Sequence, residues 1–171
     1  MGEKVMTDAE KREHLVELMD HFETAMLVTR TAGGGLRSRP LAVAEARADG
    51  GMYFATSSKS GKVHEIDDDP HVNVAMQNGH RQFVSVSGRA HVERDRGLVD
   101  RLWSESWKVW FPDGKDDPTL CLIAVEPTEA EYWDSSGATG LRYLFEAAKA
   151  FATSTRPESN DDRQNAKLPR L

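Results

Sequence analysis

The chain has 171 residues, of which 39% are hydrophobic, and it carries a formal net charge of -6 at pH 7. This length suits a single domain with its own core, and the negative charge argues against a general attraction to nucleic acid or to an anionic membrane. The sequence contains no run of about 18 apolar residues, and no apolar signal segment follows its polar N-terminus. We therefore expect a cytoplasmic protein without a nucleic-acid or membrane partner.

The first segment of the chain is predicted to form an amphipathic helix. Thr7 and Glu10 have the spacing of a capping box, in which each side chain accepts a hydrogen bond from the backbone of the other residue. Hydrophobic residues follow at helical intervals: Leu15, Leu18, Met19 and Phe22. A helix is also predicted for 141–151. The stretch 154–171 is polar and contains two prolines, so we expect a disordered tail behind one domain that spans 1–153.

Six segments have the composition or the alternation of β-strands: 25–31, 36–46, 52–56, 72–76, 84–92 and 120–133. Most of them follow one another through short turns, and helices are inserted at only three places. Such a succession favours an antiparallel barrel with peripheral helices over a doubly wound parallel sheet. The predicted fold is therefore mainly β (α+β), a six-stranded antiparallel barrel.

The turn 57–62 is crowded with hydroxyls and lysines and leads into a predicted short helix. The first N–H groups of a helix have no partner within it, so a turn of this composition suits a phosphate or another anion. The turn is not a nucleotide-binding P-loop, because Thr56 and Val63 stand where that motif needs a glycine and a hydroxyl. The alternative is an ordinary helix start with Ser60 as N-cap and the lysines in water, which composition alone favours roughly twofold.

Arg39 is a second candidate anion contact. Its planar guanidinium matches two phosphate oxygens, although a solvated strand arginine has the same sequence signature. If 37–46 and 50–56 form a hairpin, Arg39 comes near the turn 57–62, and the two features together could clamp one phosphate. Arg39 and the turn 57–62 together are stronger evidence for a phosphate site than either feature by itself.

Other chemistry finds little support in the sequence. Cys121 lies in an apolar run and is interpreted as a small buried hydrophobe rather than a nucleophile. No histidine pair has metal-ligand spacing with a supporting carboxylate, so no metal site is predicted and no catalytic residue is identified. Four tryptophans offer flat faces for a planar ligand or, equally, core and interface anchors: Trp103, Trp107, Trp110 and Trp133.

Several short motifs follow one another in a specific order: Ser38-Arg39-Pro40, Ala55-Thr56-Ser57, Ser60-Gly61-Lys62, Asp69-Pro70, Gly88-Arg89-Ala90 and Glu131-Tyr132-Trp133. In this order the chain resembles the pyridoxamine 5'-phosphate oxidase-like split-barrel flavoproteins over about residues 8–150. Within them it looks like the general stress protein 26 branch, of which the aromatic segment 107–112 is also typical.

The resemblance implies a six-stranded split β-barrel that forms a homodimer and binds FMN at two equivalent sites across the subunit interface. It implies that Arg39, Ser60 and Lys62 hold the flavin phosphate and that Thr56, with its neighbours, lines the ribityl chain and the ring. The implied cofactor-binding residues are Ser38, Arg39, Pro40, Ala55, Thr56, Ser57, Ser60, Lys62, Gln82, Trp110, Trp133 and Arg142.

The chain also departs from the vitamin B6 oxidases of that family. Ala44 stands where they carry a lysine, and the segment after Trp133 lacks the Arg-rich run that grips their substrate. We therefore expect an FMN-dependent oxidoreductase or a stress-related flavin-binding protein that acts on another small molecule. The alternatives are a binder of another flat cofactor, deazaflavin F420 or haem, and a cofactor-free dimeric interaction module.

Overall fold

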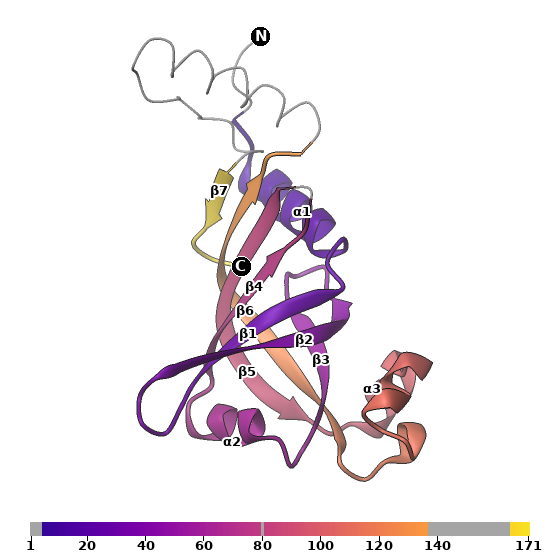
Figure 1. Ribbon diagram of the computed structural model, residues 1–171. Helices are drawn as coiled ribbons and strands as arrows, with labels where there is room; N and C mark the ends of the chain where they lie inside the picture. The colour runs from indigo at the N-terminus through magenta and orange to yellow at the C-terminus, as the bar shows by residue number, and fades with distance from the viewer. Residues whose placement is uncertain (1–4, 80, 137–164) are drawn as a thin grey trace.

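The computed structural model describes residues 5–79, 81–136 and 165–171. Its central feature is a barrel of antiparallel strands (Figure 1). The strands are β1 (Thr24–Arg30), β2 (Leu36–Ala46), β3 (Met52–Ser57), β4 (His71–Gln77), β5 (Gln82–Glu93) and β6 (Leu120–Asp134). They are ordered β3-β2-β1-β4-β5-β6, and pairing of β3 with β6 closes the ring. The predicted six-stranded, mainly β barrel is confirmed.

Alternating burial explains why these segments form strands. Along β1, β4 and β5 every second side chain points into the barrel, as the period of two residues in a strand requires. Leu27, Val74 and Val86 meet Phe54 and Tyr132 in the core, and all five are fully buried. The core therefore lies inside the barrel, and the other face of each strand is left for the surface.

The pairing of β5 with β6 shifts register next to Gly88. A Cβ atom at Gly88 would collide with the backbone carbonyl of Glu126. Only glycine therefore permits the two strands to approach at this point.

Helices cover the outside and the ends of the barrel (Figure 1). α1 (Asp8–Met19) begins with the predicted capping box, in which Thr7 Oγ1 accepts from the Glu10 backbone N–H at 3.2 Å. α2 (Gly61–Asp68) follows β3 at the lower end in Figure 1. α3 (Arg96–Leu102) and the 3-10 helices η1 (Glu105–Val109) and η2 (Gly114–Asp116) project to one side.

A seventh strand, β7 (Asn165–Leu168), pairs with the end of β6. The prediction of a disordered tail is wrong for these residues, because Ala166 and Leu168 are buried against the core. Four residues with two apolar side chains are too short a pattern to be recognised in the sequence. The predicted helix 141–151 lies outside the described residues. Within the described ranges, no helix has the length and hydropathy needed to cross a bilayer.

Candidate functional site

Lys62, in the first turn of α2, folds back over the turn that joins β3 to α2. Ser60 occupies the N-cap position, but its side chain makes no capping hydrogen bond. Its Oγ instead accepts a hydrogen bond from Lys62 Nζ at 2.6 Å, and Lys62 Nζ also donates to Thr56 Oγ1 at 3.0 Å. The lysine is therefore held in the turn rather than extended into water, contrary to the interpretation of an ordinary helix start.

Lys62 shares its surroundings with Arg39. Burial lowers the pKa of Lys62, and the positive charge of Arg39 lowers it further. The β2–β3 pairing that the sequence suggested is present, with Val43 opposite Phe54. The structure thus brings the strand arginine and the lysine of the turn together.

Arg39 is oriented by two polar groups of neighbouring elements. Its Nη1 donates to Thr29 Oγ1 and its Nη2 donates to Glu65 Oε2, both at 2.6 Å. Thr29 in turn donates to the same carboxylate oxygen at 2.5 Å, and Arg37 Nη1 donates to Glu65 Oε1 at 2.9 Å. Glu65, on α2, therefore holds two arginines of β2.

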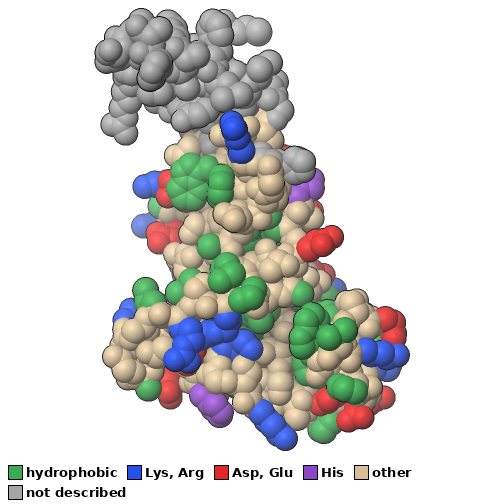
Figure 2. Space-filling model, viewed as in Figure 1, with side chains coloured by type: hydrophobic (Ala, Val, Ile, Leu, Met, Phe, Trp, Pro, Cys, Tyr) green, Lys and Arg blue, Asp and Glu red, His purple; other side chains and the backbone are tan. Residues whose placement is uncertain are grey.

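An aromatic-walled cavity of about 350 Å³ lies beside this turn. Its lining residues come from β2, β3 and the segment around η1: Pro40, Leu41, Ala42, Ala55, Thr56, Ser57, Trp107, Trp110 and Phe111. We call it the basic cavity after Lys62, which donates to Thr56 in its wall, although none of the described residues that line it is itself charged. Figure 2 shows Lys and Arg side chains gathered on the lower part of the barrel, with hydrophobic side chains beside them toward the side of α3.

Two tryptophans contribute to the basic cavity in different ways. Trp107 is buried and packs edge to face against Trp103, with ring centroids 5.7 Å apart, so it belongs to the core and also to the cavity wall. Trp110 is 65% exposed. An aromatic ring with that much free surface at the rim of a cavity is available to a planar ligand.

A second cavity, of about 560 Å³, adjoins the first and shares Ala42 and Trp107 with it. It is lined by the end of α1, by β2 and by residues after α3: Met19, Asp20, Phe22, Glu23, Thr24, Ala42, Val43, Ala44, Glu45, Ala46, Leu102, Ser104, Ser106 and Trp107. We call it the acidic cavity, because none of these described residues is basic and three carry carboxylates.

Cys121 lies in β6, behind the basic cavity. Its side chain is buried, and its Sγ is 3.5 Å from the Thr56 carbonyl oxygen. Burial raises the pKa of the thiol, which keeps it protonated and unreactive. The interpretation of Cys121 as a small buried hydrophobe is confirmed.

Some of the predicted site residues lie away from the basic cavity. Gln82 is buried at the start of β5, where its side chain bonds to Asn78 and Ser136. Trp133 lines a different groove, on the outer face of the barrel. Ser38 is exposed on β2, and Arg142 lies outside the described residues. Of the predicted site residues that the structure describes, five line the basic cavity: Pro40, Ala55, Thr56, Ser57 and Trp110. Lys62 bonds to Thr56 and to Ser60 beside it, and the charge of Arg39 acts on Lys62.

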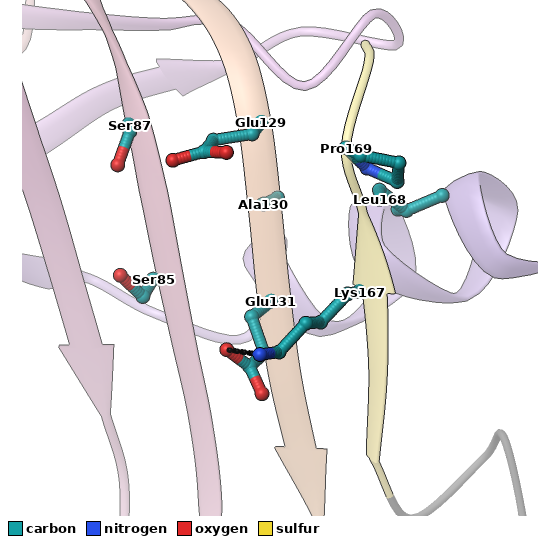
Figure 3. A pocket seen from close by; sticks show the side chains of 8 residues that line it. All are labelled: Ser85, Ser87, Glu129, Ala130, Glu131, Lys167, Leu168 and Pro169. Carbon is teal, nitrogen blue, oxygen red and sulfur yellow. Dashed lines mark ion pairs between the residues drawn. The ribbon is translucent and has the colours of Figure 1, made fainter.

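The outer face of β5, β6 and β7 bears a smaller hollow of about 200 Å³ (Figure 3). Ser87 lies opposite Glu129 and Ser85 opposite Glu131, and Glu131 forms an ion pair with Lys167 at 3.8 Å. Its only described cation is already paired and two carboxylates line it, so the hollow is unsuited to a phosphate. None of the predicted site residues lines it.

Sequence reasoning missed the groups that hold Arg39. Glu65 follows Lys62 by three positions and so lies on the same face of α2, which is a usable signal. Thr29 carries no such signal. Its position opposite Arg37 depends on the β1–β2 register, which only the folded barrel reveals.

Comparison with known proteins gives a consistent picture. A family model described as pyridoxamine 5'-phosphate oxidase like matches residues 10–158. General stress protein 26 of Bacillus subtilis is 27% identical over 139 residues, which cover 78% of this chain and 96% of that protein.

Solved structures agree. The general stress FMN/FAD binding protein of Xanthomonas citri is 27% identical, with a TM-score of 0.64 over 75% of this chain and 92% of that one. A general stress protein 26 from Jannaschia has a TM-score of 0.72 over 94% of this chain and 98% of its own, and at 23% identity it supports the fold alone.

Proposed function

We propose that this chain, which belongs to the pyridoxamine 5'-phosphate oxidase-like family, binds FMN in the basic cavity with the flavin phosphate between Arg39 and Lys62. The observation that carries the proposal is the pair of cations: Lys62 is half-buried, and the charge of Arg39 lowers its pKa. Arg37, Arg39 and Lys62 share the single carboxylate of Glu65, so a net positive charge remains for a further anion to neutralise. A phosphate monoester, with a charge of about -2, matches this charge.

The rest of FMN also finds suitable groups in this cavity. Thr56 and Ser57 present hydroxyls for the ribityl chain, while Trp107 and Trp110 present aromatic surface for the ring. A volume of about 350 Å³ is ordinary for a small-molecule site. A bound flavin would supply reversible electron or hydride transfer. The contribution of the chain's own residues is to bind the phosphate and orient the ring.

We further propose that the protein is a homodimer with the cofactor at the interface. Met26, Phe83 and Trp133 are exposed and line one groove of about 520 Å³ on the outer face. Exposed apolar surface on neighbouring strands is typical of an interface. In a twofold dimer built on this face, Gln82 and Trp133 would approach the flavin of the second copy. Such a dimer accounts for their position outside the basic cavity.

The proposed activity is that of a cytoplasmic, flavin-dependent oxidoreductase on a small molecule, or of a stress-related flavin-binding protein without turnover of its own. The acidic cavity is the proposed site of the small molecule, because it adjoins the basic cavity at Ala42 and Trp107. Glu45 in its wall is paired with Arg101, and the carboxylates of Asp20 and Glu23 favour a neutral or cationic compound. Ala44 in its wall supports the expectation that the substrate is not a vitamin B6 phosphate.

The test is a titration of the purified protein with FMN, followed by the visible spectrum and by flavin fluorescence. Riboflavin, which lacks the phosphate, is the matched ligand. We expect FMN to bind at least about tenfold more tightly than riboflavin, because the phosphate makes charge-assisted hydrogen bonds. Absence of FMN binding at concentrations well above micromolar would contradict the proposal.

The same measurements separate the alternatives. Protein purified with F420 or haem would show a visible spectrum that differs from that of FMN. A cofactor-free interaction module predicts a dimer whose elution from gel filtration does not respond to FMN.

A further inference from the structure

Glu65 is a buried carboxylate whose place the proposed function does not yet explain. It lies on α2, is 9% exposed, and is surrounded by Thr29 of β1 and by Arg37 and Arg39 of β2. Burying a carboxylate is unfavourable unless donors replace its water. Here one hydroxyl and two guanidinium groups do so.

These donors keep Glu65 ionised. The hydrogen bond from Thr29, more than any other contact, holds the pKa of Glu65 below its ordinary value; burial opposes this effect, and Arg39 and Arg37 reinforce it. A lowered pKa means that the carboxylate is negative throughout the neutral range. Arg39 therefore always faces a full negative charge on one side.

The contacts fix the plane of the Arg39 guanidinium. Two of its N–H groups are engaged, one with Thr29 and one with Glu65, and Thr29 closes the triangle by donating to the same carboxylate oxygen. A guanidinium has five N–H groups, so others remain for a ligand. Because the plane is fixed, their directions are fixed as well.

The carboxylate also balances the charge of the cluster. Arg37, Arg39 and Lys62 are three cations, and Glu65 reduces their net charge to two positive units. Without it, Arg39 would face two like charges and would be driven toward water, since it lies near the surface.

We infer that Glu65 is a positioning residue for phosphate recognition: it holds Arg39 in the orientation that receives the phosphate and sets the cluster to a charge that a phosphate dianion neutralises. The inference rests on the proposed FMN site. It assigns to Glu65 no contact with the flavin itself. Glutamine is neutral and keeps only one of the two acceptor oxygens, so the amide N–H would face the donors at the other position, either Arg37 or the pair Thr29 and Arg39.

The experiment measures the ratio of the riboflavin Kd to the FMN Kd for a set of variants. Because both ligands share the ring and the ribityl chain, the ratio isolates recognition of the phosphate, and a general loss of structure does not change it. For Glu65→Gln we expect the ratio to fall on the order of tenfold, as expected for a misaligned hydrogen bond to a charged group.

Two further sets of variants keep the test informative. Thr29→Val removes the hydroxyl at nearly constant shape and should lower the ratio, whereas Thr29→Ser retains the hydroxyl and should preserve most of it. Glu126→Gln is the matched control, because Glu126 also accepts from an arginine, Arg47 Nη2 at 2.7 Å, in a cluster that does not include Lys62 or Arg39. If Glu65→Gln fails to fold, the comparison of Thr29→Val with Thr29→Ser tests the positioning role of Glu65.

The outcomes separate the inference from the proposed function. A wild-type ratio well above one that is unchanged or raised in Glu65→Gln and in Thr29→Val would overturn the positioning role while leaving the FMN site intact. Wild-type protein that binds neither ligand, or both equally, would overturn the FMN site itself. A ratio that falls in Glu65→Gln and Thr29→Val but not in Glu126→Gln supports the inference.

Discussion

The basic and acidic cavities are neighbours that share Ala42 and Trp107, yet their polar surroundings differ: carboxylates line the acidic cavity, whereas the described residues that line the basic cavity are uncharged and one of them, Thr56, bonds to Lys62. Strand β2 and η1 contribute to both. The charge beside the basic cavity comes from Lys62 of α2 through its bond to Thr56, whereas the acidic cavity receives Asp20 and Glu23 from the residues after α1. Strand β2 of the barrel therefore lines both cavities, and the segments at its periphery supply the polar groups that determine which ligand each cavity favours.

Among the variants that test this difference between the two cavities, Lys62→Ala is expected to change FMN affinity the most. The change removes a charge-assisted contact to the phosphate and should weaken FMN binding by roughly 1–3 kcal/mol while leaving riboflavin almost unaffected. Fluorescence titration with both flavins measures it. Lys59→Ala, an exposed lysine of the same turn, is the control, and equal losses in the two variants would show that general charge rather than the cavity attracts FMN.

A smaller effect is expected from Trp110→Ala. The exposed ring at the rim of the basic cavity should contribute about 0.5–1.5 kcal/mol to stacking with a flavin. Because both ligands carry the same ring, FMN and riboflavin should lose affinity equally. A loss confined to FMN would mean that Trp110 acts on the phosphate side and not on the ring.

The pH dependence of the basic cavity follows from Lys62. Its pKa lies below the ordinary value of 10.5, so in the ligand-free protein it loses its charge at a lower pH than a free lysine. The preference for FMN over riboflavin should therefore begin to decline below pH 10.5 as the pH rises. Lys62→Arg should remove this decline, because arginine stays protonated. Titrations from pH 7 upward measure it, and a wild-type profile as flat as that of Lys62→Arg would contradict the prediction.

The smallest effect is expected in the acidic cavity. Glu23→Gln removes a carboxylate that lines that cavity and not the basic one. Thr24, next to Glu23, pairs with Ala42, three strand residues or roughly 10 Å along β1 from the position opposite Arg39. Charges at such a distance are screened, so FMN affinity should change by less than about twofold in 0.15 M salt. A larger gain in affinity would show that the two cavities act as one electrostatic site.

The sequence was sufficient for features that depend on near neighbours. The capping box of Thr7 and Glu10, the alternation along β4 and β5, and the burial of Cys121 were all predicted correctly. Each rests on residues within one helical turn or one strand, where stereochemistry imposes a fixed period. The order of the motifs then identified the family.

Contacts between residues that are distant in the chain could not be predicted from sequence patterns. Strand β7 has only Ala166 and Leu168 to mark it, and its pairing partner lies more than thirty positions away. The double role of Trp107, as core residue and as cavity wall, depends on where the segment after α3 folds back. No periodicity in the sequence encodes these contacts.

The proposed phosphate site shows most directly which features follow from the sequence and which depend on the tertiary structure. By itself the sequence determined that Arg39 and the turn before Lys62 carry the right groups for an anion, because side-chain type and helix starts are local properties. Only the tertiary structure decided that Thr29 and Glu65 would hold Arg39, and that a second cavity with carboxylates in its wall would adjoin the first. The reason is that closure of the barrel joins β1, β2 and α2 at one end, and the charge that a ligand meets is the sum over segments that are distant in the chain.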